Sequence, residues 1–388
     1  MSINNPVDQP SLAITHLDSI EHIEASQWNH LIPSNYPFIR HEFLLALEQS
    51  GCVSPQAGWT PCHLILRSSD NTLIAAMPLY RKQHSWGEYV FDQQWAQAYE
   101  QYGFHYYPKL LTAIPYTPCS GPRIIGDPDW MPIIESYIIK TITSLAKEQG
   151  ASSWHCLFPS NTTPFNSLSL LARYDVQFHW FNRGYQHIED FLKSLSSRKR
   201  KNIKRERRRI AETGITCKRF LGTEINEDMW QDFYRFYAAT YLKRQQRPYL
   251  NLTCFQQWGN CLPEQMMMVM AYHNNRPVAA ALSFFDETTL YGRYWGCLDE
   301  FHSLHFETCY YQGIEFCIER NLQQFDSGAQ GEHKISRGFE PVKTQSFHWI
   351  ENKRFRAAIS DFLERESLHI DHYQEASRRY LPFKIGDD

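Results

Sequence analysis

The sequence predicts an α+β protein whose two halves each contain a central mixed sheet flanked by helices. In each half two strand-like runs flank a polar turn, at residues 68–71 and at residues 273–276, and this pattern predicts a β-hairpin. A helix-like segment and a further strand follow in each half, an order that implies a crossover and a parallel strand pair. A chain of 388 residues also exceeds one typical domain. We therefore expect two domains, residues 1–183 and residues 184–388.

The first half is predicted to begin with a strand and two helices, followed by antiparallel strands and a helix–strand unit. Phe43, Leu44 and Leu47 recur on one face of the second helix, and a proline-rich loop at residues 115–123 interrupts the strand pattern. The predicted strands are residues 12–16, 61–67, 72–80, 84–91, 106–111 and 152–158. The predicted helices are residues 26–31, 38–49, 95–104 and 131–147.

The second half is predicted to repeat this plan. Residues 289–297 are rich in aromatic side chains, as strands prefer, and residues 305–321 carry apolar side chains at steps of three and four. We expect Phe306, Tyr310 and Ile314 to be buried on that helix, and residues 327–349 to form a polar loop. The other predicted helices are residues 188–213, 227–243 and 353–380. The other predicted strands are residues 215–220, 265–272, 277–285 and 323–326.

The composition favours a soluble, cytoplasmic protein without a metal centre. The net charge is −3, so the chain as a whole is not a polyanion-binding protein. Its ten cysteines form no C-x-x-C pair and no His/Cys ligand pattern, which argues against zinc and against a disulfide framework. The amino-terminal region lacks a basic segment followed by an apolar core, and no run of about 18 apolar residues occurs. We therefore expect neither a signal peptide nor a transmembrane segment.

Chemistry is expected in the loop after the strand 323–326, because ligands of strand–helix–strand units bind at the carboxyl ends of the strands. Residues 331–334 read Gly-Glu-His-Lys and place a carboxylate, an imidazole and an ammonium side by side. Glu332 and His333 are the candidate general bases, directly or through water, although a structural role for His333 is equally consistent with the sequence. The candidate substrate-binding residues of this region are Asp326, Gln330, Lys334 and Arg337.

Further candidates lie before this loop. Glu307 is near the first turn of the helix 305–321, where its carboxylate can point into the cleft or simply stabilise the helix dipole. Arg293 is a candidate substrate ligand and Tyr294 a candidate catalytic residue, but they are neighbours on one strand, so only one is expected to face the cleft. An aromatic stripe at helical spacing indicates core packing, although one tyrosine hydroxyl can line the site. The stripe comprises Trp230, Phe233, Tyr234, Tyr237 and Tyr241.

The segment from residue 198 to residue 209 concentrates positive charge. It holds nine of the 39 basic residues of the chain and only one of the 42 acidic ones. Leu192, Leu195, Ile203 and Ile210 give the surrounding helix a narrow apolar stripe that would seat it on the domain. The alternatives are a solvated face or a contact with a polyanion: a tRNA acceptor stem, the phosphates of CoA or anionic lipid. The residues assigned to this contact are Arg198, Lys199, Arg200, Lys201, Lys204, Arg205 and Arg208.

The chain resembles the FemAB-like bacterial family of the GNAT acyltransferase superfamily, and is similar to the Fem-type peptidoglycan aminoacyltransferases, over roughly residues 28–365. The resemblance is carried by the segments PFIRHEFLLALEQSG, PLYRK, GEYVFD, YYPKLL, PYTPCSGPR, SSRKRKNIKRERR, YGRYWG, HFETCYYQG and FDSGAQGEHKISRGFEP. It implies tandem GNAT-like domains, and it matches Lys334 to a lysine that related GNAT families carry just after their last core strand, where it would bind a carboxylate or phosphate.

The resemblance implies an N-acyltransferase that moves an acyl or aminoacyl group from acyl-CoA or aminoacyl-tRNA to an amine, in cell-envelope or peptidoglycan metabolism, with no tightly bound cofactor. CoA-using relatives carry a glycine-rich pyrophosphate loop before the crossover helix. Here residues 297–304 read CLDEFHSL, which is acidic and lacks glycine, whereas residues 123–126 of the first half match that loop only partly. No nucleophile motif occurs, so direct attack by the amine is expected. The alternative is a non-catalytic GNAT-like module that binds RNA or an anionic membrane through residues 198–209.

Overall fold

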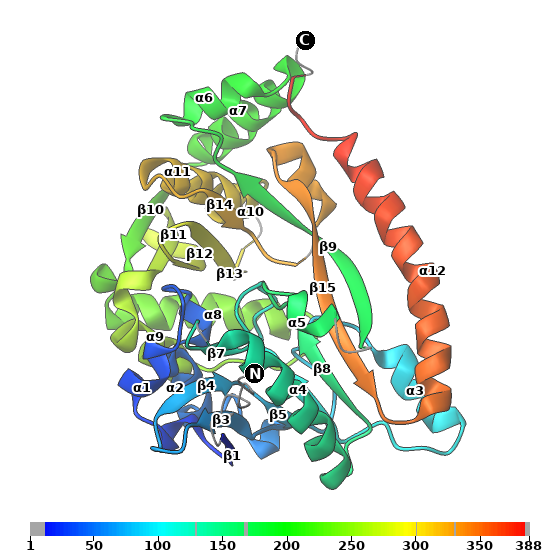
Figure 1. Cartoon of the computed structure of the whole chain (residues 1–388). Coiled ribbons are helices and arrows are strands. Elements are labelled where there is room, and N and C mark those ends of the chain that lie inside the picture. The colour runs from blue at the N-terminus through cyan, green and yellow to red at the C-terminus, as the bar shows by residue number, and fades with distance from the viewer. Residues whose placement is uncertain (1–11, 129, 167–169, 300, 330, 385–388) are drawn as a thin grey trace, which may run out of the picture.

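The computed structural model describes residues 12–128, 130–166, 170–299, 301–329 and 331–384. These residues form two lobes that are joined by two long strands and flanked by the long helix α12 (Lys353–Arg378) (Figure 1). The first lobe contains the elements from β1 (Ala13–Leu17) to α5 (Thr163–Asn166), and the second contains those from α6 (Ile188–Ser194) to β14 (Gln324–Asp326). The predicted α+β class is confirmed.

One mixed sheet of eleven strands runs through both lobes in the described part of the chain. Its order is β10-β11-β12-β13-β14-β9-β15-β8-β6-β5-β2. The pairs β13–β14 and β6–β8 are parallel, and the other neighbours are antiparallel. The bounds are β2 (Trp59–Pro61), β5 (Tyr80–Lys82), β6 (Lys109–Thr112), β8 (Ser153–Leu157), β9 (Leu171–Phe181), β10 (Ile215–Leu221), β11 (Met266–His273), β12 (Arg276–Phe285), β13 (Thr289–Cys297), β14 and β15 (Glu340–Ile350).

The two lobes exchange strands at the middle of this sheet. Strand β9 comes from the first half of the chain but pairs with β14 of the second, whereas β15 comes from the second half and pairs with β8 of the first. The two strands also pair with each other, from Glu340 opposite His179 to His348 opposite Leu171. We predicted neither strand. In β9, Tyr174, Val176, Phe178 and Trp180 do alternate with polar side chains, as in a half-buried strand, and our prediction missed this signal. The intervening Gln177 and His179, and Thr344 of β15, are nevertheless buried.

A smaller sheet in the first lobe has the order β1-β3-β4-β7, with β3 (His63–Arg67), β4 (Leu73–Met77) and β7 (Ile125–Gly126). It continues into the large sheet, because the Cys62 N–H donates to the Leu79 carbonyl where β2 ends and β5 begins. The strand predicted at residues 84–91 is wrong. This segment is irregular, and buried ion pairs of Glu88 and Asp92 with Lys109 hold it instead of strand pairing.

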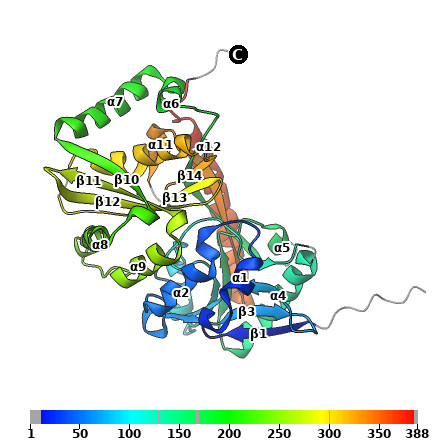
Figure 2. The ribbon, with the colours of Figure 1, turned by 90° about the vertical axis from the view of Figure 1, so that its left-hand side faces the viewer.

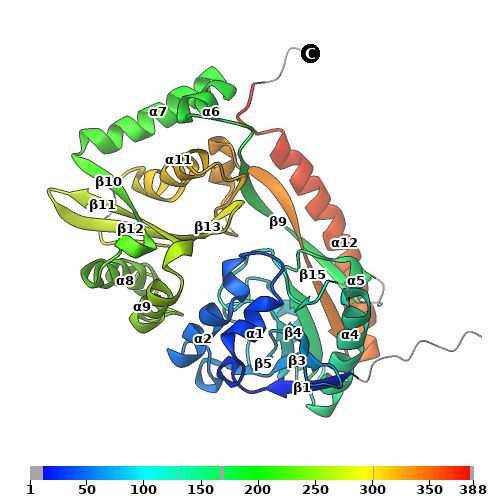
Figure 3. The same cartoon turned by 60° about the vertical axis from the view of Figure 1, so that its left-hand side comes forward.

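Helices cover both faces of the second lobe (Figures 2 and 3). On one face lie α8 (Glu227–Leu242) and α9 (Leu252–Cys261); on the other lie α7 (Ser197–Glu212), α10 (Leu304–Phe306) and α11 (Gln312–Glu319). The helix predicted at 188–213 is broken, because Leu195 is extended and forms a β-bridge with Phe383. A π-helical segment (Glu307–Tyr311) separates α10 from α11, and α9 was not predicted. The first lobe carries α1 (Ala25–His30), α2 (His41–Gln49), α3 (Gln93–Gln101), α4 (Met131–Glu148) and α5.

The largest hydrophobic cluster crosses between the lobes and fixes their relative position. Phe43 of α2 stacks on Trp258 of α9, with ring centroids 4.4 Å apart, and Phe38 packs edge-on against Phe284 of β12. Large aromatic contacts of this kind dominate packing energetics. The two lobes therefore share a core, and a cavity between them has fixed walls.

Candidate functional site

The centre of the candidate site is a β-bulge on β13. Tyr294 lies opposite Leu282 of β12, but Gly292 lies opposite Ser283, so Arg293 is an extra residue without a partner position. On its other edge, β13 pairs with β14 only from Thr289 to Tyr291, because β14 ends at Asp326. The two parallel strands separate beyond that point. Bulges next to separated strands re-aim side chains and leave room for a ligand.

Two cavities lie against this bulge. The smaller one, about 120 Å³, is covered by His305, Cys309 and Tyr310 and closed by Ser327. The larger one, about 390 Å³, lies between the lobes and reaches α8 through Tyr237, Thr240 and Tyr241. Because α8 and the His305–Tyr310 segment cover opposite faces of the sheet (Figure 3), the cavities approach β13 from opposite sides. They share Arg293, Tyr294 and Trp295 as lining residues.

The expectation that only one of Arg293 and Tyr294 faces the cleft is wrong. Both residues line both cavities, because the bulge interrupts the alternation of side chains along β13. Both carry polar atoms without a hydrogen-bond partner among the described residues, the Arg293 Nε and the Tyr294 hydroxyl. The Tyr294 residue is only 8% exposed and the Arg293 side chain 3%. Unpaired buried donors of this kind are rare in folded proteins and call for an explanation.

Three charged side chains meet where the bulge of β13 faces the end of β14. Arg293 Nη2 lies 3.0 Å from Asp326 Oδ1, which also accepts a hydrogen bond from the Gly328 N–H. Burial alone would raise the pKa of Asp326, but Arg293, His179 and that N–H outweigh it, so the pKa lies below its usual value. Lys334 is buried and donates from Nζ to the Gly328 carbonyl over 2.6 Å.

Lys334 has a perturbed pKa for a physical reason. Burial lowers the pKa, the Asp326 carboxylate opposes this, and the Arg293 guanidinium adds to it, which brings the pKa to about 7. Lys334 therefore titrates near neutral pH, a property of groups that transfer protons. It is not among the residues lining either cavity, but it lies close to Arg293 and Cys309, which are.

Glu332 and His333 lie beside the smaller cavity rather than in its wall. His333 is exposed, and its Nε2 lies 2.8 Å from the hydroxyl of Tyr310, which lines that cavity. Glu332 is exposed and accepts a hydrogen bond from the Tyr373 hydroxyl of α12 over 2.9 Å. Their assignment as catalytic bases therefore stays a prediction. The candidate Gln330 lies outside the described residues.

Glu307 and Arg337 connect helices to one another. The Glu307 carboxylate accepts hydrogen bonds from Arg207 over 3.0 and 3.1 Å and from Gln312 over 2.8 Å. Arg337 binds Glu206 over 2.8 Å, and its guanidinium lies 3.4 Å from the centroid of the Phe306 ring. Neither residue lines either cavity. The catalytic role of Glu307 and the anion-binding role of Arg337 stay predictions, and the contacts show that both residues attach the basic helix to the site.

The burial predicted for the helix at residues 305–321 is confirmed at two of the three positions named above. Tyr310 is 3% exposed and Ile314 is 0% exposed, as expected. Phe306 is only half-buried, because it lies at the surface beneath the Arg337 guanidinium. The α8 stripe behaves as predicted: Trp230 and Phe233 are in the core, while Tyr237 and Tyr241 line the larger cavity.

Sequence reasoning missed His305, although it covers the smaller cavity. Burial lowers its pKa to about 4, and the charges of His333, Lys334 and Arg337 add to this, so the imidazole is neutral at pH 7. A histidine in an otherwise apolar helical stripe was the signal that could have identified it. Trp86 and Tyr89 of the first lobe were also missed, because only the packing of the lobes brings them to the cavity.

The basic helix α7 presents one charged face to solvent. Ile203 and Ile210 are each 3% exposed and seat the helix as predicted, whereas Arg207 is turned inward to Glu307 and Glu315. Lys204 pairs with Glu189 at 2.9 Å and Arg208 with Glu212 at 3.7 Å. Lys199 and Arg200 are half-buried. The exposed basic residues are Arg198, Lys201, Lys204, Arg205, Arg208 and Arg209.

Two features are absent from the described residues. Within that part of the chain, no helix is long and apolar enough to cross a membrane. The same residues contain no group of three or more His, Cys, Asp or Glu side chains arranged to hold a metal ion.

The sequence matches the FemAB-like family, described as peptidoglycan biosynthesis/recognition, over residues 19–385. No curated protein sequence matches the chain. Among solved structures, the C-terminal domain of a putative lysylphosphatidylglycerol synthetase from Agrobacterium fabrum is similar with a TM-score of 0.53, 9% identity, and coverage of 88% of this chain and 95% of that one. FemX gives a TM-score of 0.52, 11% identity, and coverage of 87% and 99%. L-PGS from Bacillus licheniformis gives a TM-score of 0.50 and 11% identity, with coverage of 86% of this chain and 97% of that one. At these identities the likenesses show the fold alone, and they confirm the predicted mixed sheets flanked by helices.

Proposed function

Because this chain belongs to the FemAB-like family, we propose that it transfers an acyl or aminoacyl group from acyl-CoA or aminoacyl-tRNA to an amine acceptor. The observation that carries the proposal is the bulge on β13 with a cavity on each face. Two substrates can approach Arg293 and Tyr294 from opposite sides and meet there. The family description favours an acceptor from cell-envelope metabolism.

The chemistry follows from what amide formation requires. The acceptor amine must lose its proton and attack the donor carbonyl, and the resulting oxyanion must be stabilised. The tetrahedral intermediate then collapses by breaking the bond to the CoA sulfur or to the tRNA ribose oxygen, and this leaving group takes up a proton. We assign the stabilising role to Arg293, whose Nε is unpaired at the bulge. We assign proton transfer to Lys334, whose pKa of about 7 provides a neutral amine at the pH of the reaction. The attack is direct, so both substrates are bound at once.

The position of α7 favours aminoacyl-tRNA as the donor. Arg207 of α7 holds Glu307, which precedes Tyr310 in the segment that covers the smaller cavity. The basic helix therefore lies on the same side of the sheet as the smaller cavity, which we assign to the donor group. Its six exposed basic side chains suit a phosphate backbone, and the loop before α10 lacks the glycines of a pyrophosphate site.

The proposal is tested by incubating the full chain with labelled acyl-CoA or aminoacyl-tRNA and a panel of amines: amino acids, amino sugars and peptidoglycan precursor peptides. We expect label in one amine, with Arg293→Gln lowering the rate about 10²–10³-fold. Arg247→Gln, an exposed arginine outside the cavities, is the matched control and should transfer normally. Absence of transfer from either donor to any amine would contradict the proposal.

The donor is tested separately on α7. Arg198→Glu, Lys201→Glu and Arg205→Glu together reverse three exposed charges without touching Arg207. If the donor is aminoacyl-tRNA, the triple variant should raise its KM, and tRNA affinity of the parent should fall with salt as expected for roughly 3–6 neutralised phosphates. An unchanged KM for tRNA together with efficient use of acyl-CoA would exclude the tRNA donor.

A further inference from the structure

The larger cavity between the lobes has an unusual lining. Among the described residues that line it, eight are aromatic, two are the arginines Arg244 and Arg293, and none is an aspartate or glutamate. We propose that this cavity binds a ligand in which a flat ring is joined to an anionic group, a phosphate or a carboxylate. The aromatic lining residues are Trp86, Tyr89, Phe91, Tyr237, Tyr241, Tyr249, Tyr294 and Trp295.

The aromatic side chains form a continuous wall. Tyr241 packs edge-on against Tyr237 and against Tyr249, with centroids 5.0 and 5.6 Å apart. Across the cavity, the first lobe contributes Trp86 and Phe91, which are 62% and 58% exposed. Exposed large aromatic side chains that gather at one opening mark binding surfaces, because their faces offer stacking area to a flat ring.

Two buried donors in the cavity have no hydrogen-bond partner among the described residues. Arg293 donates from Nη2 to the Asp326 carboxylate, but its Nε has no partner among the described residues. The Tyr294 hydroxyl has no partner among them either. Arg244 lies exposed on the same wall. Oxygens of a phosphate or carboxylate pair with such donors through charge-assisted hydrogen bonds.

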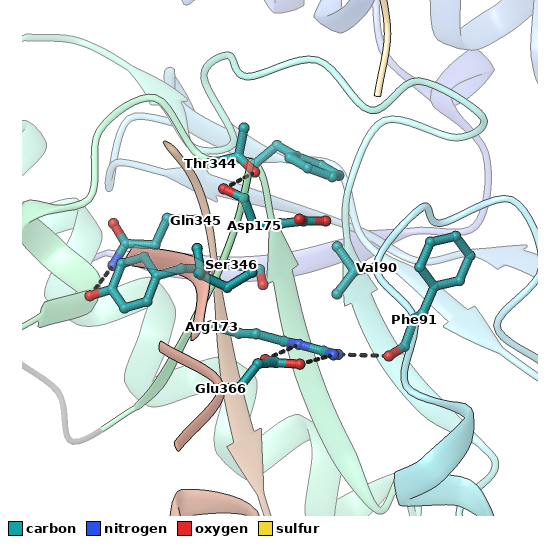
Figure 4. A pocket seen from close by; sticks show the side chains of 11 residues that line it. Val90, Phe91, Arg173, Asp175, Thr344, Gln345, Ser346 and Glu366 are labelled. Atoms are coloured by element: carbon teal, nitrogen blue, oxygen red, sulfur yellow. Dashed lines mark hydrogen bonds and ion pairs between the residues drawn. The ribbon is translucent and has the colours of Figure 1, made fainter. Parts of the chain in front are cut away.

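A neighbouring cavity shows the opposite electrostatics and serves as an internal comparison (Figure 4). It has a volume of about 100 Å³ and shares Phe91 with the larger cavity, but it contains Asp175 and Glu366. Its arginine, Arg173, is already bound by both oxygens of Glu366 at 2.7 and 2.8 Å and by the Phe91 carbonyl at 2.7 Å. That cavity therefore has no free cation for an anionic ligand.

The segment that carries Trp86 and Phe91 is held in place from both ends. Arg173 holds the Phe91 carbonyl from β9, and buried Lys109 binds Glu88 at 2.7 Å and Asp92 at 2.5 Å. Lys109 also donates to Ser85 over 2.8 Å. The aromatic wall of the first lobe is thus preformed, which lowers the entropic cost of binding.

The experiment measures binding of small probes to the full chain by calorimetry. The probes are phenyl phosphate and benzoate, which carry both features, methyl phosphate, which lacks the ring, and benzyl alcohol, which lacks the charge. We expect phenyl phosphate, benzoate or both to bind at least about tenfold more tightly than the other two probes. Arg244→Gln should weaken the anionic probes about tenfold, and Trp86→Ala should weaken the ring-bearing ones.

Exposed Arg247, which does not line the cavity, provides the control Arg247→Gln, and Trp86→Phe should retain ring binding. Equal affinity for benzyl alcohol and phenyl phosphate, or binding of phenyl phosphate and benzoate that Arg244→Gln leaves unchanged, would overturn the inference. The inference rests on the proposed function in one respect only: the ligand of the larger cavity is taken as the acceptor, because the smaller cavity is assigned to the donor group. The proposed function and this inference can fail separately, because probe binding requires no donor. Selective probe binding without transfer would contradict only the proposed function. Transfer without selective probe binding would contradict only this inference.

Discussion

Removing the Tyr294 hydroxyl should separate stability from activity. This hydroxyl is buried without a partner among the described residues, and an unpaired buried polar group costs about 1–3 kcal/mol. Tyr294→Phe keeps the ring and its contacts with Tyr237 and Trp258. We therefore expect the free energy of unfolding to rise by about 1 kcal/mol or more, while kcat falls about tenfold to a hundredfold if the hydroxyl contacts the reacting groups.

The matched control lies on the same strand. The Tyr291 hydroxyl donates to Asp286 over 2.9 Å, so Tyr291→Phe should lower the free energy of unfolding by about 1 kcal/mol or more. With an m-value of about 3 kcal/mol/M, the two variants should differ by about 0.7 M in urea midpoint. Urea titration followed by fluorescence and a transfer assay measure both effects. A Tyr294→Phe variant less stable than the parent would refute the reasoning, and one that is fully active would refute the role in catalysis.

Three further predictions concern the surroundings of the site. Arg207→Met leaves the buried Glu307 carboxylate without its ion pair and should cost on the order of 3 kcal/mol in urea denaturation, whereas exposed Arg205→Met should cost less than about 0.5. Gly296→Ala places a Cβ against the backbone of Phe236 and Tyr237 in α8 and should cost about 3 kcal/mol. Gly292→Ala should be tolerated better, because its Cβ meets the Phe325 ring at 3.1 Å and the Ser327 Cα only at an ordinary contact distance of 3.7 Å. The pKa of Lys334 is about 7 in the folded protein, against an ordinary value of 10.5, so the folded chain binds this proton less tightly than the unfolded chain does. The contribution of Lys334 to the free energy of unfolding therefore rises with pH between about 7 and 10.5, and it is lost as the pH falls through this range. Lys334→Met should remove up to about 1.4 kcal/mol per pH unit of that slope; equal slopes in parent and variant between pH 7.5 and 9.5 would contradict it.

Much of the fold was predictable because most elements carry a clear period. Strand β13 has the predicted bounds, Thr289–Cys297, and helices α8 and α12 begin at the predicted residues and end close to the predicted ones. The alternation of Val176, Phe178 and Trp180 with polar side chains marks β9 but was missed, whereas buried Thr344, Ser346 and His348 interrupt the apolar pattern of β15. The division at residue 183 stays a prediction, and the exchange shows that each lobe is completed by a strand of the other half.

The candidate site was predictable only where it lies within one strand–helix–strand unit. Arg293 and Asp326 were both candidates, and they form an ion pair between the bulge of β13 and the end of β14. The bulge at Arg293 depends on the register between β12 and β13, which single-sequence patterns do not encode. Trp86 and Phe91 reach the cavity only because the lobes pack through Phe43 and Trp258, contacts far apart in the sequence.

Two-substrate kinetics test the central claim most directly. Initial rates of amide formation are measured while donor and amine are varied independently, and the protein is examined by mass spectrometry after incubation with donor alone. Direct transfer between two cavities that meet at Arg293 predicts intersecting reciprocal plots, no acylated protein, and loss of the rate in Arg293→Gln. Parallel plots with an acylated protein, or an Arg293→Gln variant as fast as the parent, would contradict it.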